Sequence, residues 1–326
     1  MKIALTGLNG YGGNFIQELL ASKDPQEQLV AVVSQHPEKS PLYSKLKAKG
    51  IRIYPSLESC LNFEDLDLIL ITTPMHIHEK EVRLALEHGV SVYCEKPLAP
   101  TAETCRRLAS LAVQKKCLLA VGFQWSYSDG LLSLKEDLLK GRYGKILSMK
   151  TLVLWNRPRT YFSQSKWKGK LNDENAQPLN ECIISNAAAH FLHNLLFLAG
   201  KNLDEAAEPY GIKSDCYRSH PIETFDTISL QIETKEGLSL FFAGTLSAKE
   251  TQPPRFEIHC EKAVITFPEG PDSKIVARNH RGEEIDYSSP EENRFSHYRK
   301  VLRALSEGTL LPCTAKTAIP HMQVVD

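Results

Sequence analysis

The residue of this sequence best placed for chemistry is Lys96, which stands between Glu95 and Pro97 directly after the apolar run Val90–Cys94. If this run is a strand of a parallel sheet, Lys96 lies at its carboxyl end, where open α/β sheets bind their ligands. The alternative is a surface lysine that merely follows a strand. We favour a role in ligand binding because of that position.

A glycine-rich segment near the start of the chain has the features of a phosphate-binding turn. The residues that we expect to contact the phosphates are Gly7, Asn9, Gly10, Tyr11, Gly12 and Gly13. A tight turn lets the backbone approach a pyrophosphate, and the following helix offers free N–H groups at its positive end. The spacing departs from GxGxxG, but every third residue from Gly7 to Gly13 is glycine. A glycine turn without a ligand is the alternative.

The elements that would position these residues alternate between strand and helix. Apolar runs predict strands at Lys2–Thr6, Leu29–Val33, Ile51–Tyr54, Asp67–Thr72, Val90–Cys94 and Cys117–Gly122. Helical spacing is found at Asn14–Ser22, Glu79–His88 and Thr101–Lys116. Such alternation indicates α/β structure, with a doubly wound parallel sheet of the Rossmann type.

The second part of the chain has a different pattern. Strand-like runs follow one another at Ile146–Trp155, Asp226–Thr234, Leu238–Ser247, Phe256–His259 and Ala263–Phe267. Helical patterns occur at Leu131–Lys140, Ser185–Leu198 and about 294–306. Successive strands with short turns favour an antiparallel sheet.

We therefore expect two domains. Residues 1–123 would form the dinucleotide-binding Rossmann domain. Residues 124–326 would form an α+β domain for substrate binding and oligomerisation, with a large, mostly antiparallel open sheet. The C-terminal helix is the segment that could pack back on the first domain.

Three motifs together resemble the Gfo/Idh/MocA family of oxidoreductases, named after glucose–fructose oxidoreductase and inositol dehydrogenase. Thr73-Pro74-Met75-His76-Ile77-His78 matches a TPxxxH segment, and Glu95-Lys96-Pro97 matches the EKP motif about twenty residues later. Gly122-Phe123-Gln124 and the segment Gly141–Ile146 fit the continuation. The resemblance extends over nearly the whole chain.

The resemblance implies roles for the residues of these motifs. Lys96 would lie beside the nicotinamide and take part in substrate binding and proton transfer, and Glu95 and Pro97 would shape its turn. The residues lining the cofactor site would include Thr73, Pro74, His78 and Gln124. His76 and His78 would share a face if they lay on a strand, but no third metal ligand is close in the sequence, so we expect no metal.

The segment Ser185–His193 departs from the pattern DxGxHxxD that the family usually carries. His190 matches the histidine, Asn186 stands in place of the first aspartate, and His193 in place of the second. Oxidation of a secondary alcohol requires loss of an O–H proton, and histidine titrates near neutral pH. We expect His190 to be the general acid/base, Asn186 to orient the substrate, and His193 to contact it. Core histidines on an apolar helix are the alternative.

The polar stretch Asn156–Glu181 is long enough to predict a functional loop. It carries Arg157, Arg159, Tyr161 and Trp167. A set of Trp, Arg and Tyr suits a sugar face or a phosphate. We expect Arg157, Tyr161 and Trp167 to bind the substrate.

The residues after the second predicted strand favour NADP over NAD as the cofactor. NAD-selective Rossmann domains usually place a carboxylate there, which binds the ribose 2′-hydroxyl. Here Ser34 and Gln35 follow the strand, with Lys39 close behind as a cation for a 2′-phosphate. Glu38 is the residue that could reverse this preference.

Composition excludes several classes of protein. Lys plus Arg and Asp plus Glu are both 39 in 326 residues, which gives no basic surplus for nucleic acid. No apolar run is long enough to span a membrane, and no signal peptide is present, so we expect a cytoplasmic protein. The eight cysteines show no CxxC spacing, which argues against a zinc site or a disulfide framework.

The function predicted from these features is hydride transfer between a nicotinamide and a carbohydrate or polyol-like secondary alcohol or ketone. Two alternatives stay open: cleavage of a glycosidic bond by transient oxidation with tightly bound NAD, and a non-catalytic nucleotide-binding sensor. The expected partners are a small sugar-like substrate and further copies of the chain, in a homodimer or homotetramer. The apolar run Leu238–Phe242 would serve that assembly.

Overall fold

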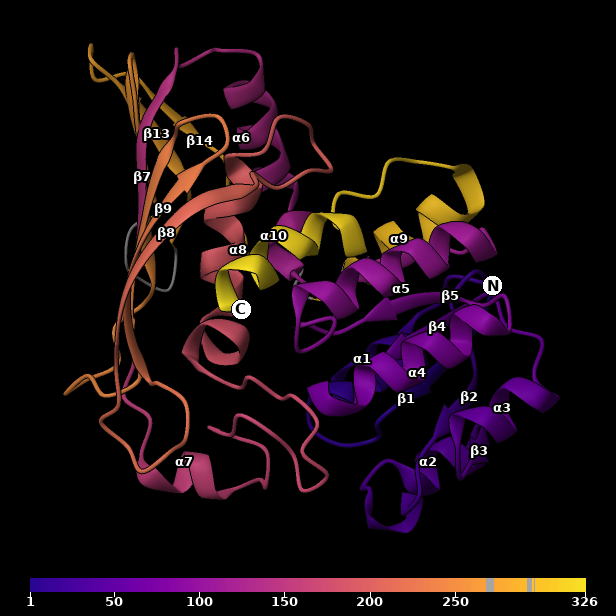
Figure 1. Ribbon diagram of the computed structural model, residues 1–326. Coiled ribbons are helices and arrows are strands. Elements are labelled where there is room, and N and C mark those ends of the chain that lie inside the picture. The colour runs from indigo at the N-terminus through magenta and orange to yellow at the C-terminus, as the bar shows by residue number, and fades with distance from the viewer. Residues whose placement is uncertain (268–272, 292–294, 296) are drawn as a thin grey trace. The chain divides into compact units, whose positions relative to one another are not determined.

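The computed structural model describes residues 1–267, 273–291, 295 and 297–326. The chain forms two compact units, each discontinuous in sequence (Figure 1). Unit 1 comprises Met1–Ala99, Glu103–Gly122 and Phe295–Lys316. Unit 2 comprises Pro100–Ala102, Phe123–Arg294 and Thr317–Asp326.

Unit 1 is built on a six-stranded parallel sheet in the order β3-β2-β1-β4-β5-β6. The strands are β1 (Lys2–Thr6), β2 (Gln28–Val33), β3 (Arg52–Tyr54), β4 (Leu68–Ile71), β5 (Ser91–Cys94) and β6 (Leu119–Val121). This strand order is that of the doubly wound dinucleotide-binding fold. Every residue of β4 and β5 is buried, as expected for strands covered on both faces.

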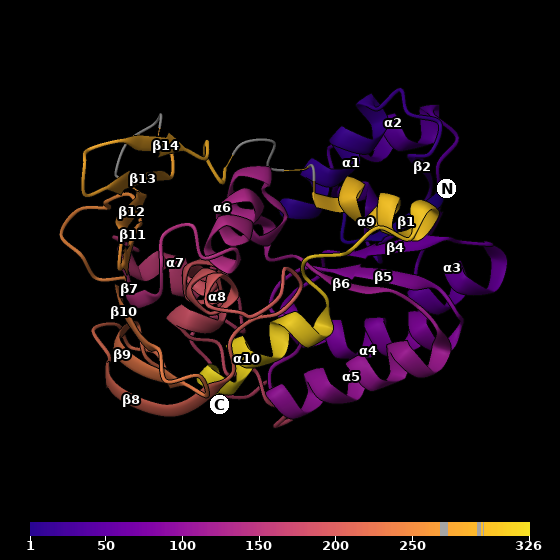
Figure 2. The same cartoon turned by 90° about the horizontal axis from the view of Figure 1, so that it is seen from above.

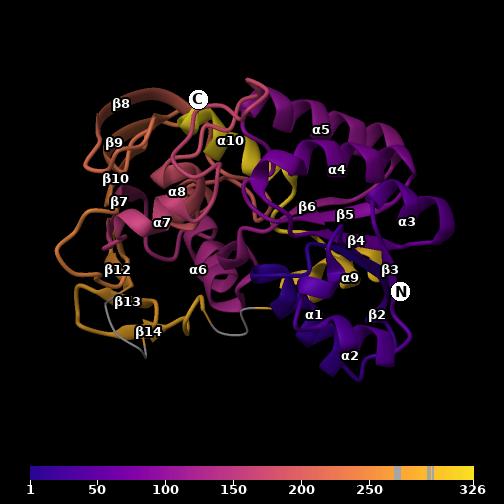
Figure 3. The same ribbon diagram turned by 90° about the horizontal axis from the view of Figure 1, so that it is seen from below.

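Helices cover both faces of this sheet. They are α1 (Tyr11–Ala21), α2 (Tyr43–Ala48), α3 (Leu57–Phe63), α4 (Met75–Glu87), α5 (Ala102–Lys115) and α9 (His297–Glu307), with a 3-10 turn η1 (Pro37–Lys39). Figures 2 and 3 show α4 and α5 on one face and α1 and α9 on the other. The glycine turn and the EKP segment both leave the sheet at the carboxyl ends of its strands.

The start of α4 differs from the prediction. The helix begins at Met75 rather than at Glu79, because Pro74 adopts extended backbone angles at the N-cap and the helix follows at once. His76 and His78 therefore lie on a helix, where residues two apart point in different directions. His76 is exposed and His78 is buried, so the expected shared face does not exist.

Unit 2 is built on an eight-stranded sheet in the order β14-β13-β12-β11-β7-β10-β9-β8. The strands are β7 (Ile146–Leu154), β8 (Pro209–Tyr217), β9 (Thr227–Thr234), β10 (Ser239–Thr245), β11 (Arg255–Cys260), β12 (Ala263–Phe267), β13 (Val276–Asn279) and β14 (Glu284–Asp286). All neighbours are antiparallel except β7 and β10, which run parallel. The predicted fold class is confirmed.

Sequence reasoning did not predict β8, which is an edge strand and pairs with β9 alone. Most of its residues are exposed, so it lacks the apolar alternation that reveals a strand. The expectation of an exposed apolar run at Leu238–Phe242 was wrong in part. Leu240 and Phe242 are 0% exposed, and Phe241 alone of these three points outward, at 44%.

The helices of unit 2 are α6 (Asp129–Leu139), α7 (Arg159–Ser163), α8 (Ala189–Leu198) and α10 (Ala315–Val325), with a 3-10 turn η2 (Gln124–Tyr127) and a π turn η3 (Ile183–Ala187). Figure 1 shows α6 and α8 on the same side of the sheet, where they form its apolar core. The predicted final helix is α9, and its expected first residue, Arg294, lies outside the described residues. Helix α10 was not predicted, and Pro320 inside it breaks the usual helical pattern.

No helix in the described ranges is both long enough and apolar enough to cross a membrane.

Candidate active site

The turn after β1 requires glycine at positions 7 and 10, which both have a positive φ, and at position 12, where there is no room for a Cβ. Gly7 has φ +93°, a conformation that side chains disfavour. A Cβ at Gly12 would come within 2.1 Å of the Gly7 carbonyl oxygen and 2.3 Å of Thr72 Oγ1. Gly10 is the N-cap of α1, where no side-chain hydrogen bond caps the helix. The backbone N–H groups of the first turn of α1 form the positive end of the helix, which favours an anion.

Glu81 ties the end of β1 to the segment after β4. From α4, its Oε2 accepts hydrogen bonds from Thr6 Oγ1 at 2.9 Å and from Thr73 Oγ1 at 2.7 Å. Burial raises the pKa of this carboxyl, while the two hydroxyl donors oppose the shift. Sequence reasoning missed Glu81, because a glutamate inside an amphipathic helix carries no signal of its own.

His78 joins the TPxxxH segment to the EKP segment. Its ring is 1% exposed, with Nδ1 2.8 Å from the carbonyl oxygen of Pro97 and Nε2 2.7 Å from that of Thr73. Burial lowers the pKa of His78, and the two carbonyls act in the opposite direction. The buried ring thus lies between the segments that follow β4 and β5, and a contact of His78 with a cofactor stays a prediction.

Lys96 lies at the carboxyl end of β5, half-buried, in a turn that its neighbours hold in place. The backbone N–H of Glu95 donates to Ile71 O at 2.9 Å, and Glu95 Oε1 accepts from the buried Tyr93 hydroxyl at 2.7 Å. The backbone N–H of Lys96 in turn donates to Glu95 Oε2 at 3.3 Å. These hydrogen bonds therefore fix the path of the backbone at Lys96.

The segment after β2 contacts the glycine turn. The Ser34 N–H donates to Tyr54 O at 2.9 Å, and the buried Ser40 hydroxyl is 3.5 Å from the Leu8 carbonyl oxygen. Gln35 and Lys39 are exposed. Glu38 faces His36, with 3.6 Å between its Oε1 and the ring Nδ1. The strand end thus carries a serine where a carboxylate would bind a ribose.

In unit 2, the two histidines of α8 have opposite surroundings. His190 is half-buried, and among the ten residues of α8, all of which the structure describes, it is the one outside the buried set. His193 is 1% exposed, stacks on Phe123 with ring centroids 3.8 Å apart, and hydrogen-bonds Ser126 Oγ at 3.1 Å. Burial holds the pKa of His193 well below its usual range. The prediction that His193 contacts the substrate is therefore corrected: its ring belongs to the core.

Asn186 is not on the same helix as His190, contrary to the prediction. It lies in the π turn η3, and Ala188 with φ −102° and ψ 14° separates this turn from α8. The amide Nδ2 donates to Glu181 Oε1 at 2.7 Å. Glu181 is 3% exposed, and its Oε2 also accepts the N–H of Gly169. A carboxylate thus stands beside the asparagine, supplied from five residues upstream rather than from position 186 itself.

The aromatic and cationic residues of the long loop also form a cluster in unit 2. The Arg157 guanidinium lies 5.0 Å from the ring centre of Trp155 and 5.3 Å from that of Tyr161. The Lys168 ammonium lies 3.7 Å from the Tyr161 ring centre. The tryptophan beside Arg157 is therefore Trp155, and Trp167 is half-buried. Binding of the substrate by Trp167 stays a prediction. Sequence reasoning missed Lys168 and Trp155, since neither stands in a recognisable motif.

Gln124 lies in η2 and groups with unit 2, whereas the predicted phosphate-binding residues belong to unit 1. Its amide Nε2 is 3.4 Å from Glu291, which also accepts a hydrogen bond from the indole of Trp125 at 2.7 Å. A contact between Gln124 and a cofactor stays a prediction.

Residues 1–123 match the model of a family described as the oxidoreductase family, NAD-binding Rossmann fold, Gfo/Idh/MocA. The inositol 2-dehydrogenase/D-chiro-inositol 3-dehydrogenase of Shouchella clausii is 24% identical over 87% of this chain and 77% of its own. The inositol 2-dehydrogenase of Pseudomonas fluorescens is 33% identical over 46% of this chain and 44% of its own. Residues 1–123 therefore match the NAD-binding Rossmann domain of the Gfo/Idh/MocA oxidoreductases.

Solved structures agree with the Gfo/Idh/MocA fold. The WlbA dehydrogenase of Bordetella pertussis, in complex with NADH and UDP-GlcNAcA, has a TM-score of 0.79 at 19% identity and covers 99% of this chain and 93% of its own. An oxidoreductase of Agrobacterium radiobacter, in complex with NAD⁺, L-tartaric acid and magnesium, has a TM-score of 0.81 at 16% identity and covers 100% and 94%. The predicted Rossmann fold is confirmed by the family match and by these solved structures.

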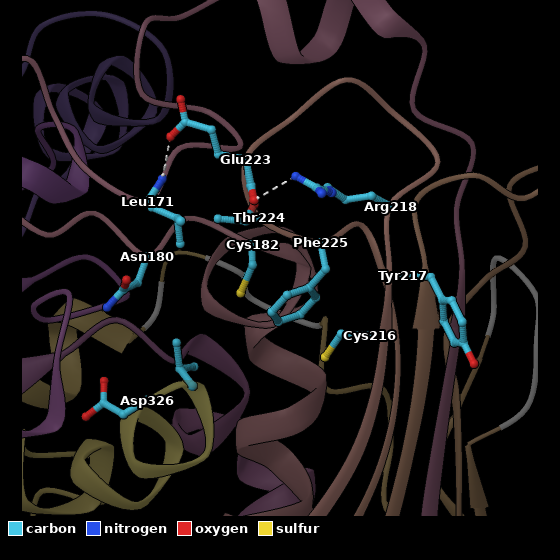
Figure 4. A pocket seen from close by; sticks show the side chains of 11 residues that line it. Leu171, Asn180, Cys182, Cys216, Tyr217, Arg218, Glu223, Thr224, Phe225 and Asp326 are labelled. Atoms are coloured by element: carbon cyan, nitrogen blue, oxygen red, sulfur yellow. Dashed lines mark hydrogen bonds between the residues drawn. The ribbon is translucent and has the colours of Figure 1, made fainter.

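A cavity of about 400 Å³ in unit 2 is not lined by the predicted site residues. Cys182, Cys216, Arg218 and Phe225 are among the unit 2 residues that line it (Figure 4). Arg218 donates to the carbonyl oxygens of Ile222 and Glu223, as the dashed line in Figure 4 indicates for Glu223. The charged side chains that line this cavity already bond to other groups of the protein, so we do not assign the active site to it. Within the described ranges, no three or more His, Cys, Asp or Glu side chains are grouped for a metal.

Proposed function

We propose that this protein is an NAD(P)-dependent dehydrogenase or reductase that acts on a secondary alcohol or ketone of a carbohydrate or polyol-like substrate. Relatives named as inositol dehydrogenases and a fold neighbour in complex with a UDP-sugar support this substrate class. The observation that carries the proposal is the shared edge of unit 1. There the glycine turn, Thr73 and Lys96 emerge from the adjacent strands β1, β4 and β5.

The residues of unit 1 fit a dinucleotide. The first turn of α1 has no side-chain cap, and the space on the side of Gly10 where a Cβ would point holds no atom within 4 Å. A pyrophosphate there would accept hydrogen bonds from the backbone of the turn, which Gly12 and Thr72 keep tight. When bound, the nicotinamide supplies the hydride acceptor or donor.

Residues of this chain would transfer the proton to or from the substrate oxygen. Lys96 would stabilise negative charge on the substrate oxygen or hand on its proton, since the ammonium is a compact cation at a fixed strand end. His190 would act as general acid/base, because it is the histidine of α8 that keeps solvent access. Asn186, which cannot take a proton, would orient the substrate, and Glu181 would orient Asn186.

We further propose that the cofactor is NADP. The position after β2 holds Ser34 and Gln35, and a 2′-phosphate can be bound by the serine hydroxyl with Lys39 as counter-charge. The solved fold neighbours named above contain NADH and NAD⁺, so the Ser34→Asp variant is the decisive comparison. It should weaken NADPH binding and strengthen NADH binding, with Lys115→Met, on the exposed last turn of α5, as the control.

Titration of the purified protein with NADPH and with NADH, followed by nicotinamide fluorescence, tests the proposal directly. Saturable binding that favours NADPH would support it and would be followed by a screen of sugars and polyols. Preference for NADH would contradict the assignment of Ser34. A cofactor that co-purifies and resists exchange would favour cleavage by transient oxidation, and the absence of binding would exclude the dehydrogenase in favour of a protein with another ligand.

The outer face of the eight-stranded sheet is the surface that we propose for self-association. Exposed apolar side chains there include Tyr217 of β8 and Phe241 of β10, which the strand register places on the face opposite the core. Light scattering after size exclusion should report a dimer or tetramer, and Tyr217→Ser with Phe241→Ser should shift it to smaller species.

A further inference from the structure

In unit 2, two cationic side chains lie against the same aromatic ring. Arg157 and Lys168 both lie against Tyr161, at 5.3 and 3.7 Å from its ring centre. In the part of the chain that the structure describes, neither forms a salt bridge, and Arg157 Nε is buried without a hydrogen-bond partner. Most other cations of this loop differ: Lys166 is paired with Glu174 at 2.9 Å and Lys170 with Glu223 at 2.5 Å.

Backbone hydrogen bonds hold the segments that carry these two cations. Arg157 donates its backbone N–H to Leu246 O at 2.8 Å, beside the end of β10. Lys168 precedes Gly169, whose N–H goes to the buried Glu181 and whose carbonyl oxygen accepts from Glu223 N at 2.8 Å. Gly169 has φ +68°, and a Cβ there would lie 2.6 Å from Ile222. The backbone directly after Lys168 is therefore held in one conformation.

The local charge balance leaves room for one anion. Glu181 is the carboxylate near the pair, and Gly169 and Asn186 already donate to its two oxygens. Burial lowers the pKa of Lys168, Arg157 lowers it further, and Glu181 opposes the shift. Burial of Tyr161 raises the pKa of its hydroxyl to about 12, so the phenol stays neutral and can donate. Two cations against one engaged carboxylate leave a net positive charge that an incoming anion would neutralise.

We propose that Arg157, Lys168 and Tyr161 bind an anionic group of the substrate, a carboxylate or a phosphate carried by the sugar. The guanidinium of Arg157 offers a planar fork of donors, and the ammonium of Lys168 adds a compact point charge. The Arg157 guanidinium also contacts Trp155, at 5.0 Å from the centre of that ring. This inference rests on the proposed function, because it names the class of sugar that the enzyme accepts.

Calorimetric titration of the NADPH-saturated protein tests this inference with three matched sugars: glucose, glucuronate and glucose 6-phosphate. Glucuronate and glucose 6-phosphate separate a carboxylate from a phosphate, and glucose carries neither. We expect one anionic sugar to bind at least tenfold more tightly than glucose. Lys168→Gln should remove about 10-fold of that affinity or more, as expected for a charge-assisted hydrogen bond, and Lys168→Arg should restore most of it.

Lys166→Gln is the control for this titration, since it removes the same charge two positions away in an exposed ion pair. It should leave anion binding unchanged. Equal binding of glucose and both anionic sugars, or equal losses in Lys166→Gln and Lys168→Gln, would overturn the anion site while leaving the dehydrogenase intact. Failure of the proposed function itself would be visible beforehand, as the absence of NADPH binding.

Discussion

The two groups of candidate site residues are held by different kinds of interaction. In unit 1, the glycine turn, Thr73 and Lys96 are positioned by backbone groups and adjacent strand ends, with the His78 ring within 2.8 Å of two main-chain carbonyl oxygens. In unit 2, the site depends on side chains that meet from separate segments, such as Glu181 with Asn186 and Arg157 with Tyr161.

This difference explains why one group is visible in a sequence and the other is not. Backbone geometry at a strand end demands particular residue types at fixed spacing, which is what a motif is. A side-chain cluster can be assembled from many combinations at many spacings, so the residue types alone do not reveal it. We therefore expect unit 1 to tolerate little change at its turns and unit 2 to respond to pairs of changes.

The largest effect is expected at Lys96. Lys96→Met should reduce turnover of the substrate found in the screen by about 10²–10⁴-fold, the usual contribution of a positioned proton-transfer group. Binding of the nicotinamide cofactor should persist, because the glycine turn is untouched. Steady-state kinetics combined with fluorescence titration separates the two. Lys115→Met, on the exposed last turn of α5, is the control, and turnover within tenfold of the unchanged protein would remove Lys96 from the mechanism.

The glycine turn gives the next effect. Gly12→Ala places a Cβ 2.1 Å from the Gly7 carbonyl oxygen, so the turn must open. We expect a loss of about 1–3 kcal/mol in the free energy of unfolding, typical of overpacking, together with loss of dinucleotide binding. Urea denaturation measures the first and fluorescence titration the second.

Gly13→Ala is the matched control for this change in stability. Its Cβ would lie 3.2 Å from Leu8 O, a contact that a small shift relieves, and alanine favours the helix by up to about 1 kcal/mol. Similar destabilisation by both changes would mean that the close approach at Gly12 does not shape the turn.

The pair Glu181 and Asn186 tests the side-chain network of unit 2. Asn186→Asp sets two carboxylates within hydrogen-bonding distance, and like charges at that range raise one pKa. A folded-state pKa above the unfolded value means that stability is full at low pH and is lost as pH rises through the raised pKa. We expect the variant to lose about 1–3 kcal/mol between pH 5 and pH 8 relative to the unchanged protein.

Glu181→Gln in the Asn186→Asp background completes a double-mutant cycle. Removal of the second charge should abolish the added pH dependence, because one carboxylate then faces an amide. If the two changes are additive at every pH, the contact between these side chains carries no coupling and the network view of unit 2 is wrong.

The smallest effect is expected at His193. Burial holds its pKa well below the usual range in the folded state, whereas the unfolded residue takes a proton near about pH 6.5. Stability is therefore full above that value and falls as pH decreases, by at most about 1.4 kcal/mol per pH unit for one histidine. His193→Phe should reduce the slope of unfolding free energy between pH 7 and pH 5.

Leu192→Ala serves as the control for His193, since it removes a neighbouring core side chain that carries no charge. It should lower stability by a similar amount at every pH. A slope unchanged in His193→Phe would show that this ring does not take part in the acid sensitivity of the fold.

The sequence by itself determined the Rossmann unit and its motifs. Buried strands such as Leu68–Ile71 must be continuously apolar, and the turns at Gly7 and Lys96 must follow them, so spacing along the chain is enough. Only the tertiary structure decided which residues of unit 2 act together. Edge strand β8 carries little apolar alternation, and the π turn before α8 separates Asn186 from His190. Glu181, Trp155 and Lys168 became candidates because the fold brings distant segments into contact, and the order of residues along a chain does not encode that proximity in a local pattern.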